Sequence, residues 1–317
     1  MDAVWGFYDS FYWPVNYKKT FTASKADFLI DQGLSHVVLL VYAHKNGIAR
    51  ELNRFLANMV QDMNQRYGRG QRRVASGLAT VMPGEPDAVE ILTEAFTTYN
   101  LAGIKMHSHV QCIAANDPSM DEVYETCVRF QKPCLIHAGK SPNSHGYKVD
   151  ADKICDVSII EDVLQRHPNL RLCVPHLGMH QYQEYFDLLD RYPNLYLDTT
   201  VALGAFMNSH EETKGLFRFL QTMFLQYSDR IFFGSDWPNI PYDWCYEIAN
   251  LISIMDGDGE AIVVPSEMPK EMRGQQRTPT TDVVLERILW RNASRFYGIS
   301  EKDLGLGQSS PAVPSQL

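Results

Sequence analysis

Three side chains that can bind a metal ion or transfer a proton follow short apolar segments of this sequence. His137 follows "PCLI", His176 follows "LCVP", and Asp236 follows "RIFFGS". Imidazole nitrogen and carboxylate oxygen bind catalytic zinc and related ions, which lower the pKa of a bound water to roughly 7. Taken singly, a strand histidine is often a hydrogen-bonded core residue, and Asp236 could cap a following helix. The recurrence of the pattern favours a shared site.

Lys105 and His107 end a similar apolar segment, "LAGIKMH". Side chains two residues apart in a strand share one face, so the two should point the same way. They could meet an anionic substrate, or Lys105 could pair with a neighbouring acid, and the sequence leaves both open. Gly139 follows His137 and is expected to let a ligand approach closely. His44 precedes Asn46 and is expected in an exposed loop.

The elements that must position these residues recur along the chain. Seven short apolar segments are typical of buried parallel strands, and they span residues 36–44, 73–81, 101–107, 133–139, 170–176, 194–200 and 230–237. Stretches with helical periodicity separate them, for example Ile48 to Met63 and Val89 to Tyr99. This alternation predicts an α/β fold with a parallel sheet.

The strand ends distinguish two architectures for that sheet. An open nucleotide-binding sheet should carry a GxGxxG turn after its first strand, and no turn here has that pattern. Ionisable residues at the carboxyl ends of strands are instead typical of a (β/α)8 TIM barrel, here apparently lacking its first strand. We expect one barrel domain over residues 1–302, with an inserted loop at 256–281 and a disordered tail at 303–317.

Composition narrows the class of partner. The 317 residues are 45% hydrophobic and carry a net charge of −9, without an extended basic cluster, which argues against nucleic acid. No apolar run approaches the roughly 18 residues of a membrane span. Six cysteines without a CxxC pair predict a reduced, cytoplasmic protein. A small molecule is the expected partner, and a homo-oligomer is left open.

Five motifs together resemble a known family. "GIKMH", "CLIHAG", "PHLG", "FGSDWP" and "ILWRNASRFYG" look like the strand-end motifs of the amidohydrolase-related family (amidohydrolase 2). That family includes aminocarboxymuconate semialdehyde decarboxylase and related metal-dependent hydrolases. The resemblance covers roughly residues 24 to 298 and rests on the order of the motifs as much as on any one of them.

The resemblance implies roles for the residues named above. It implies a barrel that binds a divalent metal, with zinc as the expected ion and His137 as a ligand on strand five. His176 is similar to the strand-six histidine that activates water or moves a proton, and Asp236 to the strand-eight aspartate that contacts both metal and water. Lys105 and His107 match the family's "GIKLH" strand end, where they would bind substrate.

One departure concerns the start of the chain. Members of the family open with a strand ending in His-x-His, whereas this chain begins "MDAVWGFYDSFYWP". We therefore expect an upstream segment that encodes this strand. The leading interpretation is a metal-dependent hydrolase of a small, anionic organic molecule that uses a metal-activated water. The alternatives are a decarboxylase of the same family and a catalytically inactive barrel that serves as a binding protein.

Overall fold

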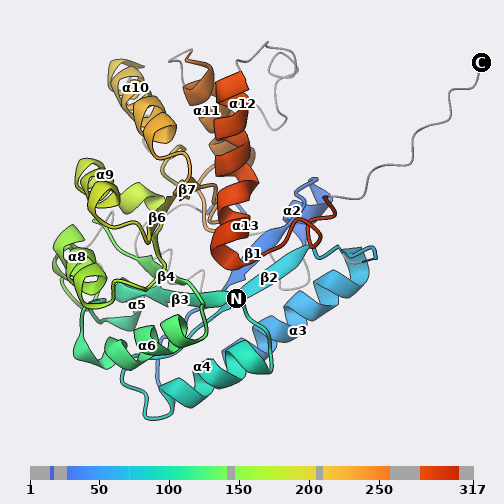
Figure 1. Ribbon diagram of the computed structural model, residues 1–317, viewed down its shortest axis with the longest axis vertical. Coiled ribbons are helices and arrows are strands. Elements are labelled where there is room, and N and C mark those ends of the chain that lie inside the picture. The colour runs from blue at the N-terminus through green and yellow to red at the C-terminus, as the bar shows by residue number, and fades with distance from the viewer. Residues whose placement is uncertain are drawn as a thin grey trace, which may run out of the picture.

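The computed structural model describes residues 15–17, 27–70, 72–140, 147–204, 210–257 and 279–306. Within these ranges seven parallel strands form one sheet whose order follows the chain (Figure 1). The strands are β1 (Val37–Leu40), β2 (Ala75–Ala79), β3 (Gly103–His107), β4 (Cys134–His137), β5 (Leu172–Val174), β6 (Leu195–Asp198) and β7 (Ile231–Phe232). The predicted α/β fold with parallel strands is confirmed.

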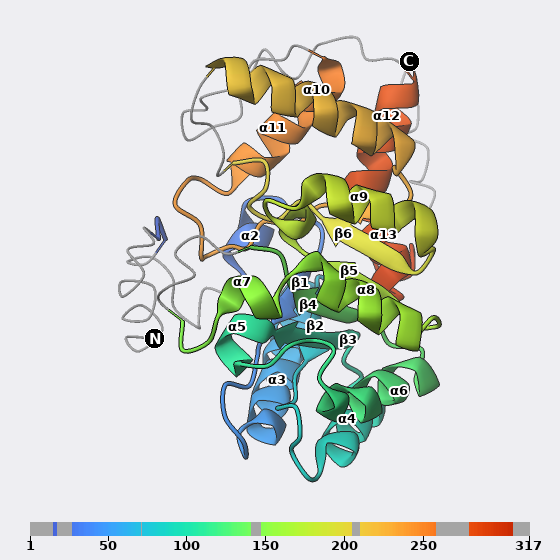
Figure 2. The same cartoon turned by 90° about the vertical axis from the view of Figure 1, so that its left-hand side faces the viewer.

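Helices connect the strands and lie around the outside of the sheet (Figures 1 and 2). The longer ones are α3 (Ala49–Tyr67), α4 (Ala88–Thr97), α6 (Asp121–Arg129), α8 (Val157–Arg166), α9 (Tyr182–Arg191), α10 (His210–Gln226), α11 (Cys245–Asp256), α12 (Pro279–Glu286) and α13 (Asn292–Tyr297). Short helices α2 (Phe28–Asp31), α5 (Ser108–Gln111) and α7 (Ala151–Ile154) lie beside them, with 3-10 turns at Pro118–Met120 and His176–Gly178 and a π-helical turn at Arg287–Arg291.

The sheet curls into a partial barrel. Each strand pairs with its neighbours in the chain, and β1 and β7 each have one paired edge among the described residues. Seven of the eight barrel strands are therefore accounted for, as predicted. The expected missing strand concerns the start of the chain, where residues 1–14 and 18–26 lie outside the described ranges.

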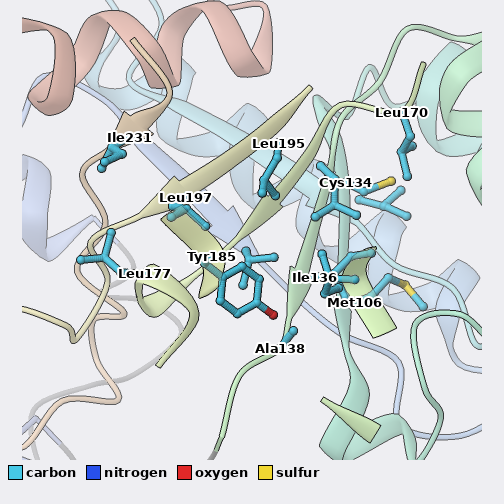
Figure 3. Close-up of a cluster of buried hydrophobic side chains, with 14 of the residues drawn as sticks. Met106, Cys134, Ile136, Ala138, Leu170, Leu177, Tyr185, Leu195, Leu197 and Ile231 are labelled. Atoms are coloured by element: carbon cyan, nitrogen blue, oxygen red, sulfur yellow. The ribbon is translucent and has the colours of Figure 1, made fainter. Parts of the chain in front are cut away.

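Alternation along the strands separates two apolar layers. Ile104, Met106 and Ile136 face outward and are fully or almost fully buried against the surrounding helices; Figure 3 shows Met106 and Ile136 among their neighbours. The intervening residues face the concave side, where Leu135 packs with Phe296 of α13 in a second, smaller core. Lys105 and His107 are the register partners of Leu135 and His137, and alternate residues of a strand point to the same face. The ionisable side chains of Lys105, His107 and His137 therefore lie on this inward face as well.

The strands are shorter than the apolar segments that predict them. Adjacent strands pair only where they overlap: β2 and β3 share two register pairs, beginning with Leu78 and Gly103.

The expected loop at 256–281 falls mostly on residues 258–278, and the expected tail mostly on 307–317, both outside the described ranges. No helix within those ranges is both long and apolar enough to cross a membrane.

Candidate active site

The carboxyl ends of β3 and β4 bring two imidazoles together. His107 and His137 are register partners in this parallel pair. Their rings stack with centroids 4.2 Å apart and planes 7° from parallel. Lys105, one inward position earlier on β3, lies behind them and is only 6% exposed. The predicted common face of Lys105 and His107 is therefore what the strand geometry produces.

His176 is placed by a turn immediately after β5. Its backbone has φ of +60°, and Leu177 follows with φ of +52°. Left-handed backbone is uncommon outside glycine and costs free energy, so the surrounding contacts must hold it in place. One of these contacts is the His176 backbone N–H, which donates to Asp198 Oδ1 at 3.2 Å. This turn aims the imidazole at His137.

Hydrogen bonds define which nitrogen of His176 carries the proton. Its Nδ1 lies 2.8 Å from the carbonyl oxygen of Thr200, which can only accept, so Nδ1 donates. In the neutral ring Nε2 then holds the lone pair, and it lies 3.1 Å from Nδ1 of His137. His137 must donate from Nδ1 to make this bond. Its own lone pair is therefore on Nε2, the nitrogen that can accept a proton or bind a metal.

Two glycines allow this close approach. A Cβ on Gly139 would lie 2.5 Å from the carbonyl oxygen of Gly178, and both glycines have positive φ. The expectation that Gly139 makes room for a ligand is therefore not what the contacts show. Its missing side chain makes room for the neighbouring backbone, and this lets the loops carrying His137 and His176 touch.

Asp236 lies farther from its strand than the sequence indicates. The last paired residue of β7 is Phe232, and Asp236 follows in a loop with φ of +53°. The alternative of a helix cap is wrong, because the next helix begins at Cys245 and its N-cap is Trp244. A left-handed backbone at this half-buried acid instead indicates a side chain held for a particular position.

One cavity of about 860 Å³ joins these residues. Its polar wall includes Lys105, His107, His137, His176, Asp198 and Asp236. The structure thus brings all five predicted site residues to one space, although their chemical roles remain predictions. Apolar residues of β1, including Val38 and Leu40, line the remainder, together with residues near α13 such as Trp290.

Burial makes the imidazoles neutral. Loss of hydration lowers the pKa of His176 to about 3 and of His109 to about 4, and it lowers the pKa of His107 and His137 well below the usual value. The positive charge of Lys105 acts in the same direction on all four. These imidazoles are therefore unprotonated at neutral pH, the form in which their free ring nitrogen can bind a metal or relay a proton.

Burial also moves the pKa values of the Lys105 ammonium and the Asp236 carboxyl group toward each other. Loss of hydration lowers the pKa of Lys105, although Asp236 and Asp198 oppose the change. It raises the pKa of Asp236 to about 7, while Lys105 lowers it and Asp198 raises it further. A carboxyl group with a pKa near neutrality can act as either acid or base.

His109 belongs to the cluster but was not selected from the sequence. It is 1% exposed, its ring centroid lies 4.4 Å from that of His137, and neither ring nitrogen has a hydrogen-bond partner among the residues that the structure describes. The spacing Lys105, His107, His109 was the available signal. It was obscured because the strand ends at His107 and α5 begins at Ser108. His44 is exposed in the loop after β1, as predicted.

The described residues fit a metal ion only in part. His137 through Nε2 and Asp236 through its carboxylate are suitable donors. However, no group of three histidine, cysteine, aspartate or glutamate side chains in the described ranges is arranged to hold a metal. Catalytic zinc sites use three protein ligands, so this donor set is short by at least one.

Comparison with known families decides the relationship. The sequence profile of the family described as Amidohydrolase matches residues 12–299, most of the chain. This chain belongs to the amidohydrolase family. The resemblance drawn from the five motifs is confirmed. A search of curated proteins finds no match.

Solved structures of similar fold include enzymes of two reaction classes. An uncharacterized TIM-barrel protein from Bordetella bronchiseptica has a TM-score of 0.57 at 15% identity, covering 96% of this chain and 91% of its own. The 5-carboxyvanillate decarboxylase of Novosphingobium aromaticivorans, with manganese and 4-hydroxy-3-methoxy-5-nitrobenzoic acid, has a TM-score of 0.58 at 14% identity, covering 94% and 87%. A probable 2-pyrone-4,6-dicarboxylic acid hydrolase from Acinetobacter baumannii, with citric acid bound, has a TM-score of 0.52 at 14% identity, covering 90% and 94%. At these identities the likeness shows the fold alone.

Proposed function

We propose that this amidohydrolase-family protein is an enzyme that hydrolyses a small organic molecule bearing a carboxylate. The observation that supports the proposal is that the Lys105 ammonium is buried at the cavity wall without a compensating partner in the described ranges. Its side chain is 6% exposed, lines the cavity, and has no hydrogen bond or ion pair with any residue in the described ranges. A buried ammonium without a partner is costly, and an anionic ligand would compensate it.

The groups around Lys105 supply proton transfer. Asp236 has a pKa of about 7, so at neutral pH a large fraction is ionised and can take a proton from water. His176 is neutral, with its Nε2 lone pair facing His137, and can receive or pass on a proton. A carboxylate held by Lys105 would place the rest of the substrate beside these groups, which is the arrangement hydrolysis requires.

Decarboxylation of a similar substrate is the second candidate. It would use the same groups, with a proton delivered to carbon in place of the departing carboxyl group. The 5-carboxyvanillate decarboxylase and the probable 2-pyrone-4,6-dicarboxylic acid hydrolase share this fold, and both are named for acids.

We propose a divalent metal as cofactor, zinc as the expected ion, with His137 and Asp236 as ligands. A further ligand would have to complete the set.

A substrate panel tests this function. Carboxylated lactones, amides, aryl acids and semialdehydes are offered to the protein with added Zn²⁺ or Mn²⁺, and products are followed by carbon dioxide release and by mass spectrometry. Hydrolysis adds water to the product mass, whereas decarboxylation removes carbon dioxide. His44→Asn, in an exposed loop, is the matched control for His176→Asn and should retain full turnover.

The panel also distinguishes the inactive alternative. Binding of carboxylates without turnover, unchanged in His176→Asn, would identify a binding protein that uses Lys105 alone. Absence of both binding and turnover across the panel would contradict the proposed substrate class.

A further inference from the structure

A second buried acid lies outside the cavity wall, on helix α11. Glu247 is 0% exposed and is not among the residues that line the cavity. Its two carboxylate oxygens accept the backbone N–H groups of Leu203 and Gly204 at 3.1 and 3.2 Å. Tyr242 donates its hydroxyl to the same carboxylate. Burial raises the pKa of this group to about 8, so it is largely protonated near neutral pH, and its oxygens still accept these three hydrogen bonds.

The two backbone groups belong to the loop that follows β6. This loop, residues 199–204, contains Val201 with φ of +62°, an unfavourable conformation for a β-branched residue. The tight packing continues at Gly204, where a Cβ would lie 2.4 Å from the ring of Tyr242. A strained segment keeps its shape only where surrounding contacts hold it, and Glu247 supplies two of them.

The same loop carries the acceptor for His176. The carbonyl oxygen of Thr200 receives the Nδ1 proton of His176 at 2.8 Å. At its start the loop is held by Asp198, whose Oδ1 accepts the N–H of Thr200 at 3.0 Å. At its far end it is held by two side chains of α11, Glu247 and Asn250, and the Asn250 side-chain amide donates to the carbonyl oxygen of Leu203 at 2.8 Å. The position of the Thr200 carbonyl therefore depends on anchors on both sides.

We propose that Glu247 is a positioning residue that fixes the tautomer of His176 by holding the loop of residues 199–204. With the loop in place, His176 keeps its proton on Nδ1 and presents the Nε2 lone pair to His137. Without it, the Thr200 carbonyl moves and the proton is free to occupy Nε2, the nitrogen that must accept. The catalytic consequence rests on the proposed function, but the tautomer itself does not.

Imidazole NMR on the full chain tests the proposal without a substrate. Long-range ¹H–¹⁵N spectra report which nitrogen of each neutral histidine is protonated, and the signals of His176 are assigned by their loss in His176→Asn. Glu247→Gln keeps the size of the side chain but loses one acceptor oxygen and directs an amide N–H₂ at a backbone N–H. We expect the Nε2–H tautomer of His176 to increase about tenfold relative to wild type, the effect of one lost buried acceptor.

Two further variants make the result decisive. Tyr242→Phe keeps both backbone hydrogen bonds to Glu247, so it should leave the tautomer of His176 unchanged. Glu247→Asp, one methylene shorter, replaces the glutamine variant if that variant does not fold, and the same increase is expected. A folded Glu247 variant with the wild-type tautomer ratio would overturn the proposal. An equal increase in Tyr242→Phe would also overturn it, because general loosening of the loop would then explain both.

A kinetic readout follows once a substrate is known. Because Glu247 does not line the cavity, Glu247→Gln should lower kcat and leave KM unchanged. A rise in KM alone would contradict a role through His176. Failure of the substrate panel would leave the NMR result standing, so the two proposals can fail separately.

Discussion

Replacing Lys105 with methionine should stabilise the protein and impair its function. Methionine has a similar length and lacks the charge, so it removes a buried ammonium that has no ion-pair partner in the described ranges. Replacing a buried ion pair by apolar groups of similar volume often gains about 1–4 kcal/mol, and a buried charge without a partner should gain a similar amount because nothing compensates its lost hydration. At roughly 2–4 °C per kcal/mol for a large domain, the melting temperature should rise by about 2–16 °C.

The functional effect should have the opposite sign. A hydrogen bond to a charged group contributes about 1.5–3 kcal/mol, so losing it should weaken carboxylate binding by roughly 10- to 150-fold. Thermal and denaturant unfolding give the first quantity, and calorimetric titration with the best acid from the substrate panel gives the second. Lys132→Met is the matched control, since Lys132 is partly buried, lies beside Phe96 and does not line the cavity. It should leave acid binding unchanged.

The outcome also decides between the two interpretations of Lys105. If Lys105 instead forms a structural ion pair with Asp198 or Asp236, its removal leaves an uncompensated buried carboxylate. Such a loss typically costs about 3–5 kcal/mol. A Lys105→Met protein that is less stable by that amount, with acid binding unchanged, would refute the reasoning behind the proposed function.

Three further predictions follow from the site. His176→Asn should reduce turnover by roughly 10²- to 10⁴-fold with metal content and melting temperature nearly unchanged, and equal losses of metal and activity would make His176 a ligand instead. Gly139→Ala should destabilise the protein by about 2 kcal/mol or more in denaturant unfolding, because the new Cβ meets the Gly178 carbonyl and φ is +90°; an unchanged midpoint would contradict this packing. Burial raises the pKa of Glu247 to about 8, so the folded state holds its proton more tightly and the associated stability falls as pH rises from about 4.5 to 8. Unfolding of Glu247→Gln measured at pH 5 and 8 should show a smaller pH dependence than wild type, and an identical slope would show that Glu247 does not titrate in this range.

The sequence predicts the parts of the site that depend on strand order. Lys105, His107 and His137 are on paired strands, and a two-residue period is sufficient to put them on one face. Asp236 was expected at a strand end because the apolar run continues to Phe233, but hydrogen-bonded pairing ends at Phe232. Its place in the cavity depends on a loop conformation with positive φ, which no apolar periodicity encodes.

Other residues could not have been found from spacing at all. Glu247 is on a helix, 44 residues from Leu203, and its hydrogen bonds to that loop are formed only in the folded chain. An acid in an amphipathic helix is usually solvent-exposed, so its sequence context indicates nothing unusual. The tautomer of His176 likewise depends on a backbone carbonyl of Thr200, which has no sequence signature.

The order of the strands has a consequence for how the site is assembled during synthesis. His137 and His176 are 39 residues apart, whereas Asn16 and its partner Asp243 are 227 apart. Closing the shorter loop costs less conformational entropy, and domains begin to fold from their amino-terminal side while translation continues. All residues that orient the imidazole pair, except the anchor on α11, have been made once the ribosome has passed Gly204. The pair can therefore form on the nascent chain before the segment that carries Asp236 and Glu247 has left the ribosome, and the last third of the chain then supplies both acids.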